Sequence, residues 1–225
     1  MAAAVAFLVG PLSAYFALLP AMGGFVIFAL GGLLSLIATI TGIVAIVRHS
    51  GEARSAGMRG LLVGVVVFAV FLVIALPGGN FPRINDITTD TENPPQFVAV
   101  LNIPANAGRD MSYPGGSFAE QQKAGYPDLQ PLRLPEPPPV VYARVDAAAR
   151  SMPGWVLLRR DPDSRTIEGT DSTRIFHFHD DFVIQVRPDG DGSVVQMRSK
   201  SRDGKGDIGA NAARIEKFFK RVSGL

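Results

Sequence analysis

The chain contains no cysteine. Disulfide bonds, thiolate zinc sites and cysteine nucleophiles are therefore excluded from its chemistry. Charge is also scarce before residue 80, where the charged side chains are Arg48, Glu52, Arg54 and Arg59. Removing these three basic residues and one acidic residue from totals of 22 and 20 leaves a remainder with equal numbers of each sign. A remainder without basic excess does not indicate a nucleic-acid-binding domain.

Long apolar runs fill the first third of the chain. Crossing about 30 Å of hydrocarbon takes roughly 20 apolar residues in a helix. The sequence predicts three transmembrane helices, at about residues 3–19, 24–47 and 61–77. Proline and glycine at 20–24 and 77–79 mark their ends, because both residues interrupt helices. The first 79 residues are therefore predicted to form a membrane α-helical bundle.

The first apolar segment has a second interpretation, as a cleavable signal peptide. It lacks a basic leader, and the apolar run continues past the place where a cleavage site is expected. These features favour a retained helix, while cleavage stays open as the alternative.

The short basic connection before the third apolar run predicts the orientation. Arg48, Arg54 and Arg59 lie in it, and short loops rich in arginine stay in the cytoplasm. The sequence therefore predicts a multi-pass protein of the inner (cytoplasmic) membrane. Its N-terminus would be cytoplasmic and its C-terminal domain extracytoplasmic, that is, periplasmic.

Glycines recur in the second and third apolar runs, at 23–24, 31–32, 42, 60 and 64. Small residues let membrane helices approach closely. Packing within one bundle is the favoured interpretation, and a homo-oligomer held by these glycines is the alternative. The predicted spans contain no charged residue, so an ion or proton pathway is not indicated.

The remainder divides into two parts. Residues 80–139 are rich in proline and turn formers, and we expect an extended segment wrapped on the domain core. Within it, residues 97–101 fit a short strand or a helical turn. Residues 140–225 show regular apolar periodicity and form the predicted α+β core.

The predicted core has a helix at each end and strands between them. The helices are expected at 140–152 and 207–222, with Asp207 as N-cap of the second. Alternating patterns and turn residues predict strands at 155–160, 166–173, 175–179, 181–187 and 193–199. Helix, strands and helix in this order indicate a two-layer α+β domain with an antiparallel sheet.

Basic residues cluster near the end of the chain. Arg198, Arg202, Asn211 and Arg214 could hold an anion or a lipid headgroup beside a helix N-terminus. The alternative, which we favour, pairs Arg202 or Arg214 with Asp207, Asp180 or Asp181.

Acidic residues and histidines supply the other candidate sites. Asp86 and Asp90 could do acid/base chemistry or bind a cation, although capping of turns is the favoured interpretation. His177 and His179 alternate beside two aspartates, but the sequence specifies no third ligand. We therefore predict no metal site and no cofactor.

Two long strings are distinctive. They are residues 84–95, Ile-Asn-Asp-Ile-Thr-Thr-Asp-Thr-Glu-Asn-Pro-Pro, and residues 198–215, which begin Arg-Ser-Lys-Ser-Arg-Asp-Gly-Lys-Gly. With Asp180-Asp181 between them, they resemble the bacterial and plastid family of domain of unknown function 1499. The resemblance spans nearly all of 81–222, and three apolar helices before the domain fit its bacterial members. It implies a domain boundary and no activity.

The sequence favours a membrane-anchored, non-enzymatic binding or interaction module of the cell envelope. Besides the lipid bilayer, the expected partner is a lipid headgroup, another anionic ligand or an envelope protein. A hydrolase or other enzyme acting on an envelope substrate through Asp86 and Asp90 is the alternative, and a purely structural subunit of a membrane complex is the third.

Overall fold

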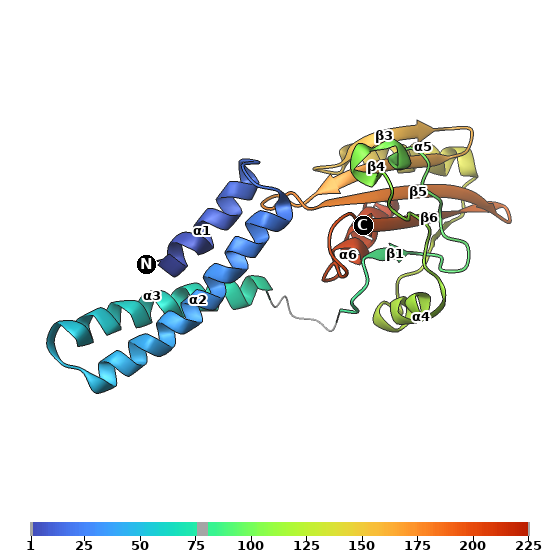
Figure 1. Ribbon diagram of the computed structural model, residues 1–225. Coiled ribbons are helices and arrows are strands. Elements are labelled where there is room, and N and C mark those ends of the chain that lie inside the picture. The colour runs from blue at the N-terminus through green and yellow to red at the C-terminus, as the bar shows by residue number, and fades with distance from the viewer. Residues whose placement is uncertain (1, 76–80, 225) are drawn as a thin grey trace. The chain divides into compact units, whose positions relative to one another are not determined.

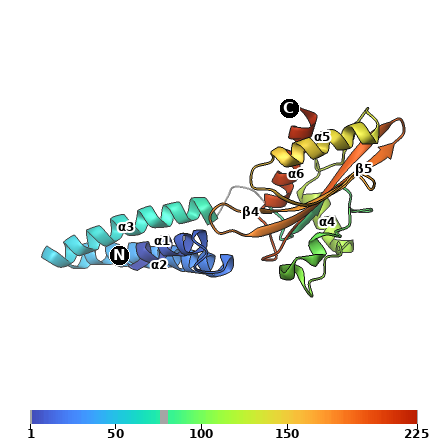
Figure 2. The same ribbon diagram turned by 90° about the horizontal axis from the view of Figure 1, so that it is seen from above.

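The computed structural model describes residues 2–75 and 81–224. The chain divides into two compact units (Figures 1 and 2). The first contains the helices before residue 80 together with Thr173–His177, and the second contains the rest of the chain.

In the part of the first unit that is described there are three helices: α1 (Ala2–Tyr15), α2 (Ala21–Arg48) and α3 (Gly51–Ala75). By length and composition, two helices in the described residues can cross a membrane, α2 and α3; the 14 residues of α1 are fewer than that requires. Two of the three predicted spans therefore qualify by length and composition, and α1 alone does not. The first helix ends early because the chain turns after Tyr15, where Ala17 has a left-handed φ of 54°.

The connection between the second and third apolar runs is shorter than predicted. Most of it is helical, because α3 begins at Gly51 and not near residue 61. Its Glu, Ala, Arg and Met residues are good helix formers, which explains the early start. The basic side chains thus lie at the end of α2 and in the first turns of α3.

Glycines lie where these helices meet. A Cβ atom added to Gly42 would lie 2.7 Å from the backbone oxygen of Gly57, and one on Gly64 would lie 2.8 Å from the backbone nitrogen of Thr39. The missing side chains therefore let α2 and α3 approach closely. Packing inside the unit is confirmed at these positions, and association of copies through the glycines stays a prediction.

An antiparallel sheet forms the centre of the second unit, as predicted, and it has six strands in the described residues. The strands are β1 (Asp86–Thr88), β2 (Leu132–Leu134), β3 (Val156–Asp161), β4 (Thr166–Ser172), β5 (His179–Asp189) and β6 (Gly192–Ser201). Their order is β1-β6-β5-β4-β3, and β2 also pairs with β6. The longest ladder is the β5–β6 hairpin, whose turn passes through Gly190 at a φ of 59°.

Among its described residues, this unit also has three α-helices and two 3₁₀ turns: α4 (Gly116–Gly125), α5 (Pro138–Ser151), α6 (Ala210–Ser223), η1 (Val100–Asn102) and η2 (Pro104–Asn106). The prediction of an extended segment over 80–139 missed α4 and the short strands. Residues 175–178 connect β4 to β5 and do not extend the sheet. The last helix begins at Ala210, after Gly209 with a φ of 81°, and not at Asp207.

The two faces of the sheet differ in chemistry. Helices α5 and α6 lie on one side of the sheet (Figure 2), over an apolar core that includes Phe182, Met197 and Phe218. Trp155 packs in this core, its ring centroid 4.0 Å from that of Phe182. Successive strand residues point to opposite faces, so β6 presents Arg198 and Lys200 to the other side. There the chain around η1 and η2 covers them.

Candidate functional site

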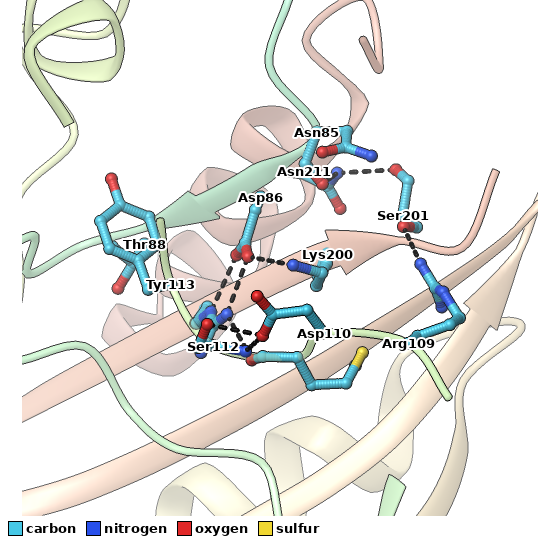
Figure 3. Close-up of polar contacts among 12 residues, drawn as sticks. Asn85, Asp86, Thr88, Arg109, Asp110, Ser112, Tyr113, Lys200, Ser201 and Asn211 are labelled. Carbon is cyan, nitrogen blue, oxygen red and sulfur yellow. Dashed lines mark hydrogen bonds and ion pairs between the residues drawn. The ribbon is translucent and has the colours of Figure 1, made fainter. Parts of the chain in front are cut away.

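Asp86 is the centre of a charged cluster on the second face of the sheet (Figure 3). Strand β1 pairs with β6 so that Asp86 lies opposite Lys200. Asp86 accepts hydrogen bonds from Nε and Nη2 of Arg198 at 2.8 and 2.7 Å, and from Nζ of Lys200 at 2.8 Å. The side chains of Asp86 and Arg198 are fully buried. The buried Asp86 carboxylate therefore forms ion pairs with two cations, Arg198 and Lys200.

The remaining contacts of Arg198 reach the covering segment. Its Nη2 also donates to the backbone oxygen of Met111 at 2.8 Å. The guanidinium carbon lies 4.7 Å from the ring centroid of Phe97 and 5.6 Å from that of Tyr113, distances at which aromatic rings attract a cation. Arg198 thus joins the sheet to the irregular chain above it.

Ionisable groups next to this cluster are shifted by their surroundings. Burial raises the pKa of the Tyr113 hydroxyl to about 12, and the nearby Asp86 charge adds to the shift, so the hydroxyl stays protonated at neutral pH. Hydrogen bonds from Ser112 lower the pKa of the exposed Asp110 carboxyl, with a smaller contribution from Lys200. Asp110 is therefore charged at neutral pH.

A second polar cluster lies on the opposite face, below α6. Arg214 donates to Asp180, to Asp171 at 3.0 Å and to the side-chain oxygen of Asn211 at 2.6 Å. Asn211 also accepts from the Ser199 hydroxyl at 2.6 Å. Because β6 alternates its side chains, this cluster is separated from Arg198 by the sheet.

Arg202 extends the first cluster towards β5. Its Nε and Nη2 donate to Asp181 at 3.1 and 2.6 Å. Asp181 is also bound by the side-chain amide of Asn106 at 2.8 Å, on the covering segment. The Asp181 carboxylate therefore bonds both Arg202, directly after β6, and Asn106 on the covering segment.

The four predicted anion contacts do not form one site. Arg198 and Asn211 lie on opposite faces, and the three arginines each have a carboxylate partner inside the domain. The predicted internal pairing is confirmed for Arg214 with Asp180 and for Arg202 with Asp181. Asp207 was wrongly included, because its carboxylate accepts from the backbone nitrogens of Gly209 and Asn211 instead.

The side chain of Asp90 stabilises a turn by accepting backbone hydrogen bonds. One of its oxygens accepts from the backbone nitrogens of Glu92 and Asn93 at 3.0 and 2.9 Å, and the other from the Gln196 amide at 2.7 Å. The capping interpretation is confirmed for this residue. Asp86 and Asp90 thus have separate sets of partners, and no contact joins the two carboxylates in the part of the chain that the structure describes.

The two histidines of interest differ in position. His177 lies in the β4–β5 connection with a left-handed φ of 57°, and His179 begins β5. Among the residues described, no group of three or more histidine and carboxylate side chains is placed to bind a metal ion.

Sequence reasoning missed two buried polar residues. Glu168 on β4 is fully buried, and its Oε2 accepts from the consecutive backbone nitrogens of Val98, Ala99 and Val100 at 2.8–3.2 Å. Gln122 on α4 bonds both backbone groups of Thr88, at 3.0 and 2.7 Å. No local sequence pattern predicts these hydrogen bonds of Glu168 and Gln122, because their backbone partners are 34 to 70 residues away in the sequence.

Comparison with known protein families gives a match that covers most of the second compact unit. The sequence profile of a family described as "Protein of unknown function (DUF1499)" matches residues 86–222. No curated protein and no solved structure matches the chain.

Proposed function

The chain belongs to the DUF1499 family of proteins of unknown function, and we propose that it is a membrane-anchored, non-enzymatic binding module of the cell envelope. The observation that carries this proposal is the internal neutralisation of the domain's buried charges. Asp86, Asp180 and Asp181 each bond an arginine. Removing one partner of such a pair leaves a buried charge uncompensated, so these carboxylates are committed to arginines inside the domain.

The alternative is a hydrolase acting on an envelope substrate through Asp86 and Asp90. A general acid or base must come within hydrogen-bond reach of the substrate. Asp86 is fully buried beneath Arg198 and Lys200, and Asp90 is bound to a turn and to Gln196. Neither arrangement favours catalysis.

Membrane anchoring is supported by the exposure of the long helices. In their most apolar windows, only 22% of α2 and 11% of α3 is buried, whereas a core helix of a soluble protein would be mostly buried. A signal sequence near the N-terminus satisfies the same length and composition. The second long helix, α3, follows α2 directly, which supports two retained spans.

The basic residues between these helices support a topology. With Arg48, Arg54 and Arg59 on the cytoplasmic side, α3 leads outwards and the C-terminal domain lies outside, whether or not α1 crosses the membrane. We further propose that α1, together with the apolar residues 16–19 after it, forms a third span. The N-terminus would then lie in the cytoplasm, and the membrane would be the inner membrane of the cell.

Single-cysteine labelling tests the topology, since the natural chain has no thiol. Ser50→Cys lies between α2 and α3, and Asp191→Cys lies in the β5–β6 turn, both at exposed positions. In intact spheroplasts, a membrane-impermeant maleimide should label the Asp191→Cys variant at once and the Ser50→Cys variant only after permeabilisation. The reverse pattern overturns the topology, and release of the protein by alkaline carbonate overturns the anchoring.

The residues predicted to contact an anion have a different role in this proposal. Arg198, Arg202, Asn211 and Arg214 support the domain, and an anion bound by the three arginines would have to displace carboxylates already in place. A binding surface is better sought among basic residues without such partners.

A further inference from the structure

Helix α6 carries a stripe of residues that is not used for packing. Ala213, Glu216, Lys217, Lys220 and Arg221 are spaced three and four residues apart and therefore share one face. The opposite face packs into the core through a different set: Ala212, Ile215, Phe218 and Val222. The first stripe is thus free to meet a partner.

The stripe forms one wall of a groove. Ser151, Met152 and Pro153, at the end of α5, form the other wall. The groove has a volume of about 670 Å³, within the range of roughly 300 to 1,000 Å³ that is usual for small-molecule sites. Both walls belong to the second unit, so the groove is a feature of this domain itself. We call it the α5–α6 groove.

The cations in this groove lack the carboxylate partners found elsewhere in the domain. Within the described residues, Lys217, Lys220 and Arg221 form no ion pair, whereas Arg144, for example, pairs with Glu136. The Nε of Arg221 donates to the Ser151 hydroxyl at 3.0 Å, which holds this side chain against the α5 wall. Three cations and a single carboxylate, Glu216, give the groove a positive charge.

Helix electrostatics explain only part of this arrangement. Basic residues in the last turn of a helix interact favourably with the negative end of its dipole, which accounts for Lys220 and Arg221. Lys217 lies a turn earlier, and the dipole requires neither the shared face nor the groove beside it. Apolar surface from Met152, Pro153 and Ala213 lies next to the charges.

We propose that the α5–α6 groove binds the headgroup of an anionic phospholipid, an inference that rests on the proposed membrane-anchored binding function. Lysine and arginine are suited to a phosphate diester, and the adjacent apolar surface is suited to the glycerol and first methylenes of the lipid. A domain tethered to a bilayer meets lipid headgroups at high effective concentration. Binding would fix the domain to the surface of the membrane that anchors it.

Hydrogen–deuterium exchange of the full-length protein in detergent micelles gives a local test. Added short-chain phosphatidylglycerol should slow exchange at residues 151–155 and in the last turn of α6, while phosphatidylcholine of equal chain length should not. The triple variant Lys217→Gln, Lys220→Gln, Arg221→Gln should need roughly 100-fold more phosphatidylglycerol for the same protection, since each basic residue near an anionic surface strengthens binding about fivefold.

A matched control separates the groove from general charge. The triple variant Arg83→Gln, Arg174→Gln, Lys205→Gln removes the same charge from exposed residues without ion pairs in the described chain, and should bind like the natural protein. Fluorescence of Trp155, the single tryptophan, should report an unchanged melting temperature for both variants.

Several outcomes would overturn the groove assignment. They are equal protection by phosphatidylcholine, equal weakening in both triple variants, and protection by inorganic phosphate or an acidic peptide at the same concentration. Protection confined to α1–α3 would also do so. None of these results changes the cysteine-labelling pattern, so failure of the groove and failure of the proposed topology are distinguishable.

Discussion

At the scale of single residues, Asp86 is expected to contribute strongly to the stability of the domain. It compensates Arg198, whose side chain is fully buried, and also bonds Lys200. Removing one partner of a buried ion pair leaves an uncompensated charge in a medium that solvates it poorly. The carboxylate thus holds together β1, β6 and the segment that Arg198 bonds at Met111.

Asp86→Asn should destabilise the domain by about 3 to 5 kcal/mol, the usual cost of breaking a buried pair from one side. Urea unfolding followed by Trp155 fluorescence measures this change. Asp110→Asn is the control, because Asp110 lies near the same cations but is exposed, and it should unfold close to the natural protein. A similar midpoint for both variants would show that burial of the pair contributes little.

The sequence predicted the residues of these clusters better than their partners. The basic residues near the end of the chain were recognised as a cluster, and the structure pairs Arg198 with Asp86 and Arg202 with Asp181. The sequence also named Asp180 and Asp181 as partners. It did not connect Asp86 with Arg198, because 112 residues separate them and one sequence contains no record of so distant a contact.

At the scale of elements, strands with apolar alternation and marked turns were predictable. Both β3 and β4 lie within one residue of their predicted bounds, and β5 and β6 are longer than predicted. Helix α4 was missed because it carries no apolar stripe: its buried residues are Ala119 and Gln122. Gln122 is held by backbone hydrogen bonds to Thr88, which hydrophobic periodicity does not report.

The small-residue pair Gly60 and Gly64 on α3 makes a matched test of helix packing. A Cβ on Gly64 would lie 2.8 and 2.9 Å from backbone atoms of Thr39 and Ser35, whereas one on Gly60 would meet only Ala38, at 3.9 Å. Gly64→Ala should therefore weaken α2–α3 packing by roughly 1 to 3 kcal/mol, the usual effect of overpacking. Gly60→Ala should not.

The reporter for this test is Ser35→Cys, introduced into both variants. Ser35 is fully buried in α2, so maleimide labels its replacement only when the helices separate. Labelling in detergent should be faster with Gly64→Ala than with Gly60→Ala. Equal rates would mean that α2 and α3 adjust to the added methyl group without cost.

At the scale of the whole molecule, acidic groups are distributed very unevenly. Before residue 80 the single carboxyl side chain is Glu52. In the C-terminal domain several carboxyls have a pKa lowered by hydrogen bonds, from Ser112, Arg144, Arg160 and Ser164 respectively: Asp110, Glu136, Asp146 and Asp161, the last to about 2. Protonation therefore acts almost entirely on one unit.

The sign of the effect follows from these shifts. A carboxyl whose pKa is lower in the folded state stabilises the fold above its ordinary value, 3.8 for aspartate, and loses that contribution as the pH falls through the folded value. Asp207 acts in the opposite direction, because burial raises its pKa. Four lowered groups against one raised group predict a net loss of domain stability between about pH 4 and pH 2.

Acid should thus unfold the C-terminal domain while α1–α3 stay helical. In detergent, lowering the pH from 7 to 2 should change Trp155 fluorescence, because its ring leaves its contacts with Phe182 and Phe218. Far-UV circular dichroism should keep the signal of the three apolar helices, whose backbone hydrogen bonds do not depend on ionisation. The Asp146→Asn variant should lose less stability across this range than the natural protein, since its side chain cannot be protonated there. Loss of both signals in one transition would contradict this prediction. It would show that the stability of the two units does not differ in its dependence on the ionisation of carboxyl groups.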